Sequence, residues 1–339
     1  MLDLNNTFII AEIGVNHNGS VDLAKEMIRE AKSSGADAVK FQTFTAEALV
    51  SKETPKVDYQ KETTGEAESH YDMIKSLELS HDDHYPIIEY CDLNNIQFIS
   101  TPYDVESAKF LDKIGVNVFK TASADIVDLS LHNFLARTGK TIIISTGMAT
   151  MGEVRETLDI YKASNNLDVI LLHCVSNYPC EFKSLNLRAM MTLESEFGVP
   201  VGYSDHAYGS YPAVAAVAMG AKVIEKHFTL DKKLIGPDHK ASSTPEEFRE
   251  LVKAIRICET SLGSSVKSVQ EEEMQMRQVS RKSIFVVNTI RKGSPIRLEN
   301  LTLRRPGMGL YAKSFAELEG KLAKYDLKAG HMMTLDDVL

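Results

Sequence analysis

Several features that would assign a chain to a specialised class are absent from this sequence. It contains no tryptophan, it has four cysteines without a CxxC pair, and no apolar run approaches the length of a membrane span. We therefore expect free thiols in a reducing compartment, and no association with a membrane. The first seven residues, MLDLNNT, include no basic residue, so we predict no signal peptide and a cytoplasmic location.

An excess of positive charge is also absent. The 38 lysines and arginines are outnumbered by 47 aspartates and glutamates, which gives a formal net charge of -9. General nucleic-acid binders carry a basic surface, so nucleic acid is not expected as a partner. The 339 residues, 43% hydrophobic and 25% charged, suffice for one large globular domain and one small domain.

What the sequence does contain is a repeated alternation of strand-like and helix-like segments. Eight short apolar runs, rich in β-branched residues, are typical of parallel strands buried on both faces. They begin at Phe8, Ala38, Gln97, Val118, Thr141, Val169, Val199 and Lys222. The segments between them carry helix-capping signals, such as Ser20 before the first helix and Thr244 before the last. Eight such units predict a (β/α)8 barrel, with a doubly wound open sheet as the alternative.

Two segments depart from this alternation. The segment from Ala46 to about Leu79 is a long polar connection after the second strand, and we predict that it is an active-site lid. After residue 263, a polar linker over 264–281 precedes a module with short strands and turns over 282–339. The expected domains are therefore a catalytic barrel over 1–263 and a small module that packs on its own barrel or on a partner's.

Two histidines, His206 and His227, end the last two apolar runs. If these runs are neighbouring parallel strands, both imidazoles emerge at the same sheet end, about 4.8 Å apart. Two nitrogen ligands so placed could bind a divalent metal. Glu225, two residues before His227, could support a metal ligand or pair with a lysine.

Lys40 and Lys120 each follow an apolar run, which predicts that they lie in the barrel mouth. Such a lysine can bind a phosphate or carboxylate, or act as a Schiff-base nucleophile. Short hydroxyl donors follow other strands, at Ser123, Ser145 and Ser204. Lysines and hydroxyls together suit a phosphorylated carboxylic acid. Glu12 is a candidate general base, and Asp238 either contacts a polyol or caps a turn.

Eight motifs, in order along nearly the whole chain, resemble those of the nonulosonic (sialic) acid synthases. They are AEIGVNHNGS, VKFQTF, ISTPY, IISTGMAT, LLHCVSNYP, GYSDH, VIEKHFTLDK and GPDHKAS. The closing LRRPGMGL resembles the antifreeze-like (SAF, β-clip type) domain of that family. The resemblance implies a TIM barrel followed by a SAF domain, in a homodimer that swaps each SAF domain onto the partner's barrel.

The resemblance also implies the reaction. Such enzymes condense phosphoenolpyruvate with an N-acetylated mannosamine-type sugar and water, and they release phosphate. The expected substrate is N-acetylmannosamine, giving N-acetylneuraminate. The lid sequence equally resembles legionaminate synthases, so 2,4-diacetamido-2,4,6-trideoxymannose is the alternative sugar. His206 and His227 are expected to bind Mn2+ or Mg2+, with Co2+ as a further option, and the metal polarises the sugar aldehyde.

The same resemblance assigns roles to the remaining residues. Glu12, beside the sugar aldehyde, is expected to transfer a proton. Residues expected to hold phosphoenolpyruvate are Lys40, Thr101, Lys120, Ser123, Ser145 and Ser204. Residues expected to contact the sugar are Gln42, Tyr178, Asp238 and, from the partner subunit, Arg305. Three positions depart from the common family pattern, and we expect them to affect substrate preference: Asp125, Ser176 and Met308.

Two other functions are consistent with parts of the sequence. A Schiff-base aldolase would use Lys40 or Lys120 as its nucleophile. A carbohydrate- or surface-binding protein would act through the C-terminal module. Basic residues argue against a flat apolar binding face on that module: Lys292, Arg297, Arg304 and Arg305.

Overall fold

The structure is a computed structural model that describes residues 2–65 and 67–339. The chain divides into two compact units, Met1–Gly263 and Ser264–Leu339. No helix in these described ranges is long and apolar enough to cross a membrane. All four cysteines are free thiols, as the sequence predicts.

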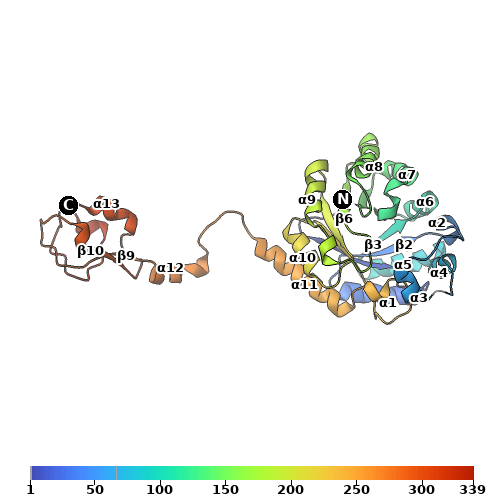
Figure 1. Ribbon diagram of the computed structural model, residues 1–339, viewed down its shortest axis with the longest axis horizontal. Helices are drawn as coiled ribbons and strands as arrows, with labels where there is room; N and C mark the ends of the chain where they lie inside the picture. The colour runs from blue at the N-terminus through green and yellow to red at the C-terminus, as the bar shows by residue number, and fades with distance from the viewer. Residues whose placement is uncertain (1, 66) are drawn as a thin grey trace. The chain divides into compact units, whose positions relative to one another are not determined.

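Eight parallel strands of the first unit close into a barrel in sequence order, with β8 paired to β1 (Figure 1). This closure confirms the (β/α)8 prediction and excludes the doubly wound open sheet. The strands are β1 (Phe8–Gly14), β2 (Ala38–Thr43), β3 (Gln97–Pro102), β4 (Val118–Thr121), β5 (Thr141–Ser145), β6 (Val169–His173), β7 (Val201–Asp205) and β8 (Val223–His227). The last two begin slightly later than the predicted Val199 and Lys222.

Helices surround the strands on the outside of the barrel (Figure 1). They are α1 (Val21–Ser33), α5 (His81–Leu93), α6 (Val105–Lys113), α7 (Leu129–Arg137), α8 (Met151–Ala163), α9 (Arg188–Phe197), α10 (Tyr211–Ala218) and α11 (Pro245–Leu262). Both predicted caps are confirmed, because Ser20 accepts from the Leu23 N–H and Thr244 accepts from the Glu247 N–H. These bonds satisfy backbone donors that a helix start otherwise leaves free.

Two apolar layers hold the barrel together. The larger layer lies between strands and helices, and the smaller one fills the barrel interior. Buried residues of the interior layer are Leu2, Ile10, Ala38, Ile99, Val118, Ile143, Ile170, Leu172 and Val223. Because side chains alternate along a strand, Ile10 and Ala38 face the same side as Glu12 and Lys40. The interior layer is therefore an apolar floor beneath the polar residues at the strand ends.

The connection after β2 folds into three short helices: α2 (Ala46–Leu49), α3 (Asp58–Thr64) and α4 (His70–Ser76). We call residues 46–79 the lid. A small core joins the lid to the barrel, with Met73 and Leu77 packed against Val15 and Phe44. Val15 and Phe44 follow β1 and β2, so the lid is anchored beside the carboxyl ends of these strands.

The second unit has its own apolar core, which includes Ile284, Val286, Ile296, Leu301 and Leu327. Its regular elements are α12 (Met274–Ser280), β9 (Ser283–Val286), β10 (Leu301–Arg304) and α13 (Phe315–Leu318), with β9 and β10 antiparallel.

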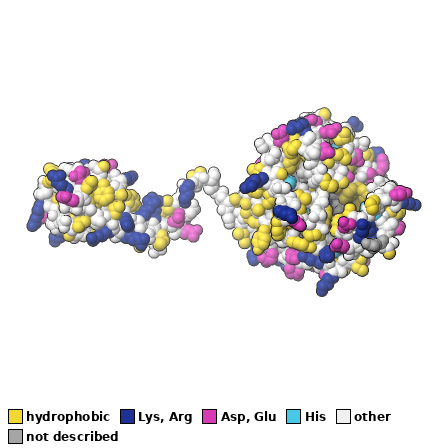
Figure 2. Space-filling view, viewed as in Figure 1, with side chains coloured by type: hydrophobic (Ala, Val, Ile, Leu, Met, Phe, Trp, Pro, Cys, Tyr) yellow, Lys and Arg dark blue, Asp and Glu magenta, His cyan; other side chains and the backbone are white. Residues whose placement is uncertain are grey.

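Seven short 3-10 helices, distributed over both units, complete the described elements: η1 (Ser123–Val127), η2 (Phe182–Ser184), η3 (His239–Ala241), η4 (Glu271–Glu273), η5 (Leu298–Asn300), η6 (Ala312–Ser314) and η7 (Leu335–Asp337). On the face shown in Figure 2, acidic and basic side chains are interspersed over the barrel unit.

Candidate active site

A cavity of about 550 Å³ opens at the carboxyl ends of the strands, beneath the lid. Predicted site residues that line it are Glu12, Lys40, Gln42, Lys120, Ser123, Ser145, Tyr178, Ser204, His206, His227 and Asp238. Thr101 does not line the cavity, but it is buried and accepts a hydrogen bond from Lys40 Nζ at 3.2 Å. Arg305 belongs to the second unit, where it is exposed directly after β10.

Strand register explains why these residues meet. Glu12 of β1 lies opposite Lys40 of β2 on one side and opposite His227 of β8 on the other. Ser204 of β7 lies opposite Glu225 of β8. Because Glu225 and His227 are two residues apart, both face the barrel interior. Four adjacent strands therefore place a lysine, two carboxylates, a hydroxyl and an imidazole side by side.

Two lysines and two glutamates form a buried charge network at the bottom of the cavity. Lys40 Nζ lies 2.8 Å from Glu12 Oε2 and 3.8 Å from Glu225 Oε2. Lys120 Nζ lies 3.9 Å from Glu225 Oε2, and it also donates to Ser145 Oγ and to the carbonyl of Thr121. All four charged side chains are at most 6% exposed. The network is balanced in charge, so each buried ion has an opposite partner.

The network shifts the pKa values of its members in different directions. Burial alone would raise the pKa of Glu225, but the Lys120 and Lys40 ammonium groups overcome this effect and bring it to about 2. Burial raises the pKa of Glu12, although Lys40 opposes the shift. Burial lowers the pKa of Lys120, whereas the two carboxylates beside Lys40 raise the pKa of Lys40 against burial. Glu225 is thus a fixed anion, and Glu12 is the carboxyl group more able to hold a proton.

The two histidine rings stand at the rim of this network, with centroids 5.6 Å apart. Burial lowers the pKa of His206 to about 4, and burial together with His206 and Lys40 lowers the pKa of His227 well below its usual value. His206 Nδ1 donates to the Val175 carbonyl at 2.7 Å, which leaves Nε2 with its lone pair free. Ser204 Oγ, 3.3 Å from that Nε2, is also 2.8 Å from Glu225 Oε1, to which it donates.

These two imidazoles fit a divalent metal ion. Both are neutral, and His227 Nδ1 is buried without a hydrogen-bond partner among the residues that the structure describes. Within the same residues there is no group of three or more His, Cys, Asp or Glu side chains arranged to hold a metal. A metal held here would take two protein nitrogens and would complete its coordination from water and substrate oxygens.

The opposite side of the cavity is aromatic and acidic. The Tyr178 ring lies 4.2 Å from the His206 ring and 5.7 Å from the Tyr59 ring of the lid. Asp238 Oδ2 lies 3.7 Å from His227 Nδ1. Burial, followed by the nearby Glu12 charge, raises the pKa of Asp238 to about 7. Tyr178 therefore lies on the lid side of the histidines, whereas Gln42 donates to Glu12 Oε1 at 3.1 Å and lies beside the charge network.

The sequence predicted an active-site lid, but it did not identify which lid residues line the cavity. Its apolar lining residues are Leu49, Val50, Val57, Met73, Ile74 and Leu77, with Val15, Phe44 and Tyr103 from the barrel. Tyr59, Gln60 and His70 add polar groups from the lid helices. No motif spacing could have identified them, because their approach to the cavity depends on the path of a long connection. Glu225 had a signal, its position two residues before His227, but its role between two lysines depends on barrel closure.

The three residues that depart from the family pattern lie in different parts of the structure. Ser176 lines the cavity, whereas Asp125 lies outside the cavity wall and Met308 is in the second unit. Burial, followed by the Asp128 charge, raises the pKa of Asp125 to about 7.

Gly147 packs so closely that an added Cβ would lie 2.4 Å from Ser176 Oγ and 2.8 Å from Ser123 Oγ. A side chain at position 147 would therefore displace these two hydroxyls.

Known protein families and known proteins match this sequence over most of its length. The sequence model of the NeuB family matches residues 27–267, and that of the SAF domain matches residues 281–339. The N,N'-diacetyllegionaminic acid synthase of Legionella pneumophila is 46% identical over 327 residues, which cover 95% of this chain and 92% of that protein. The N,N'-diacetyllegionaminic acid synthase of Campylobacter jejuni is 42% identical, with 97% of this chain and 99% of that protein covered.

A solved structure also shares this fold. The N-acetylneuraminic acid (sialic acid) synthetase of Leptospira borgpetersenii, crystallised with citrate, superposes with a TM-score of 0.73 at 36% identity. The match covers 80% of this chain and 90% of that chain. The two legionaminic acid synthases match at least 95% of this chain, whereas the NeuB family model begins at residue 27, after β1.

Proposed function

This chain belongs to the NeuB family and carries a SAF domain, and on that premise we propose that it condenses phosphoenolpyruvate with an N-acetylated amino sugar. The products would be a nine-carbon α-keto acid and phosphate. The observation that carries the proposal is the buried pair of lysines beside two neutral imidazoles. One end of the cavity suits an anion, and the other suits a hydroxylated sugar.

Phosphoenolpyruvate is assigned to the lysine end of the cavity. Lys40 and Lys120 supply two ammonium groups, and Ser123, Ser145 and Ser204 supply hydroxyls around them. An anion bound there exchanges its hydration for charge-assisted hydrogen bonds, which are stronger in a buried site than in water. Glu225 stays ionised between the lysines and holds their ammonium groups at the bottom of the cavity.

His206 and His227 would hold a divalent metal, Mn2+, Mg2+ or Co2+, which when bound supplies a Lewis acid for the sugar's carbonyl oxygen. Carbon 3 of phosphoenolpyruvate would form the new bond to the sugar's carbonyl carbon. Water would add at carbon 2, and the carbon–oxygen bond to phosphate would then break. Glu12, whose pKa is raised by burial, would carry the proton exchanged with the sugar's carbonyl oxygen.

Two sugars are candidates for the lid end of the cavity. N-acetylmannosamine would give N-acetylneuraminate, and 2,4-diacetamido-2,4,6-trideoxymannose would give a legionaminate. The second sugar has a methyl group at carbon 6 and an additional acetyl methyl group at carbon 4. The apolar lid wall around Val57 and Met73 favours it, as does the similarity to two legionaminic acid synthases. Two extra buried methyl groups, at about 0.8 kcal/mol each, correspond to roughly tenfold selectivity.

The test is phosphate release from phosphoenolpyruvate in the presence of Mn2+, measured in parallel with the two sugars. Release that depends on a sugar supports the proposal, and the ratio of kcat/KM values identifies the sugar. Absence of release with both sugars would refute it. If borohydride instead traps a substrate on Lys40 or Lys120 and no phosphate appears, the protein is a Schiff-base aldolase.

A further inference from the structure

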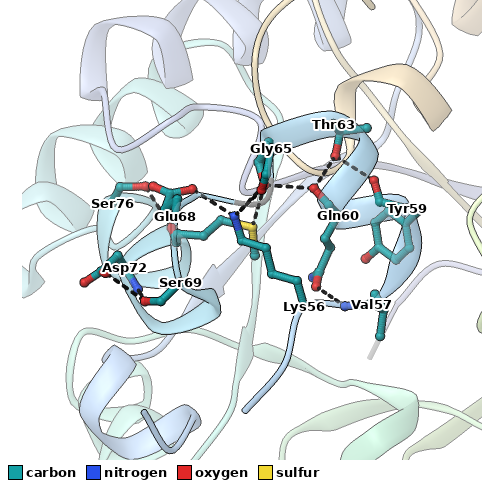
Figure 3. Close-up of polar contacts among 12 residues, drawn as sticks. Lys56, Val57, Tyr59, Gln60, Thr63, Gly65, Glu68, Ser69, Asp72 and Ser76 are labelled. Carbon is teal, nitrogen blue, oxygen red and sulfur yellow. Dashed lines mark hydrogen bonds and ion pairs between the residues drawn. The ribbon is translucent and has the colours of Figure 1, made fainter. Parts of the chain in front are cut away.

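A buried lysine in the lid, Lys56, makes contacts that the reaction itself does not require. Its ammonium group donates to Thr64 Oγ1 at 2.9 Å, to the Gly65 carbonyl at 3.2 Å and to Glu68 Oε2 at 3.2 Å (Figure 3). All three acceptors follow or end α3, whereas Lys56 precedes it. The side chain of Lys56 is only 4% exposed. One lysine therefore connects the two ends of a single lid helix.

Helix α3 is short, and its residues are not buried. It has seven residues, none of them buried, and Val57 at its N-cap has no side chain that can accept a hydrogen bond. A helix this short is not stable by itself in water. Within the described residues, the start of α3 is otherwise held by Gln60, whose Oε1 accepts from the Val57 N–H at 3.1 Å (Figure 3).

The acceptor Thr64 also contacts the small core that joins the lid to the barrel. Thr64 Oγ1, which accepts from Lys56, lies 3.5 Å from Met73 Sδ. Met73 is 2% exposed and packs in the small core with Val15 and Phe44. Loss of the Lys56 donors would remove all three hydrogen bonds between the end of α3 and the residue that precedes the helix.

Helix α3 presents Tyr59 and Gln60 to the cavity, and Val57 lines it immediately before the helix. Tyr59 contacts Tyr178, which in turn contacts the His206 ring. None of these lid residues contacts Lys40 or Lys120 in the charge network. Helix α3 therefore borders the part of the cavity beside Tyr178 and His206.

We propose that Lys56 is a positioning residue that fixes α3 over the cavity and thereby sets the affinity and selectivity for the sugar. This inference rests on the proposed function, because it assigns the sugar to the lid end. Lys56 touches neither substrate, so its effect is expected on sugar binding and not on phosphoenolpyruvate binding.

The experiment compares Lys56→Met, which keeps the apolar stem but removes the donors, with Lys56→Arg, which keeps charge and donors. Lys61→Met is the matched control, because Lys61 lies on the same helix and its partner Asp58 is 97% exposed. For Lys56→Met we expect the KM of the sugar to rise by roughly tenfold or more, with the KM of phosphoenolpyruvate unchanged. Lys56→Arg should recover most of the sugar affinity, and Lys61→Met should resemble the wild type.

Hydrogen exchange of the free protein provides a second readout that requires no turnover. Amides of residues 58–65 should exchange faster in Lys56→Met than in the wild type or in Lys61→Met. Unchanged exchange would overturn the inference whether or not the protein is active. Faster exchange with an unchanged sugar KM in an active enzyme would overturn the positioning role. Absence of phosphate release by the wild type would refute the proposed function, while the exchange result would still test how α3 is held.

Discussion

Replacing Glu225 by glutamine removes one charge from the centre of the buried network and keeps the size of the side chain. Glu225 Oε2 lies 3.8 Å from Lys40 Nζ and 3.9 Å from Lys120 Nζ, so each attraction amounts to about 4 kcal/mol at an effective dielectric constant of 20. Desolvation of the carboxylate offsets several kcal/mol of this sum. The remaining loss in the free energy of unfolding is about 3–5 kcal/mol, the range found when one partner of a buried pair is removed.

The substitution also leaves the two ammonium groups facing a single carboxylate, Glu12. Phosphoenolpyruvate supplies negative charge at the same place if it binds there as proposed. We therefore expect added phosphoenolpyruvate to stabilise Glu225→Gln more than it stabilises the wild type. The variant thus tests both the energetics of the network and the location of the anion site.

The assay is urea unfolding of the barrel unit followed by far-UV circular dichroism, in the presence of a chelator so that no metal contributes. Glu156→Gln, an exposed residue of α8, is the control for loss of one negative charge at the surface. A loss of less than 1 kcal/mol in Glu225→Gln would refute the reasoning about the network. Equal stabilisation of both proteins by phosphoenolpyruvate would refute the location of the anion site.

Three further predictions test other parts of the site. Chelation should abolish phosphate release by the wild type, and added Mn2+ should restore it; His227→Ala should stay inactive and should lose Mn2+ binding in calorimetry. Burial raises the pKa of Asp125 from 3.8 to about 7. Between pH 3.8 and about pH 7, the Asp125 carboxyl is therefore protonated in the folded protein and ionised in the unfolded chain. Wild-type stability should therefore fall as the pH rises through this window, and Asp125→Asn should be the more stable protein at pH 8 by roughly 2–4 kcal/mol in urea unfolding. Arg305→Ala should raise the KM of the sugar but not that of phosphoenolpyruvate. If Arg305 acts in the partner's site, mixing Arg305→Ala with His227→Ala subunits should produce sites with the sugar KM of the wild type, which neither variant has alone. A sugar KM that stays raised after mixing would contradict a swapped dimer.

The barrel was predictable because its signal is local and repeated. Each strand is a short apolar run with β-branched residues, and several helices begin with a capping residue such as Ser20 or Thr244. Strand ends were less well defined, as the later starts of β7 and β8 show. For β7 the reason is that Val199 and Pro200 before the strand continue the apolar pattern. The closure of the sheet followed from the number of units, and the structure confirmed it.

The gathering of site residues at one mouth also followed from the sequence. The (β/α)8 topology brings the carboxyl ends of all strands together, so polar residues such as Lys40 and His227 had to meet there. Thr101 shows where this reasoning stops. The family resemblance predicted that it contacts phosphoenolpyruvate, whereas in the structure it does not line the cavity and accepts a hydrogen bond from Lys40.

The architecture and the set of side chains at the strand ends are encoded locally, because alternation along a strand and the repeated strand–helix unit are properties of short segments. The pairing of those side chains, and the segment that covers them, became known from the folded chain alone. Glu225 is held between two lysines because β8 closes against β1, and Lys56 is buried because the lid folds back on itself. Such contacts join residues far apart in the chain, and their geometry depends on loop paths that no periodic pattern encodes.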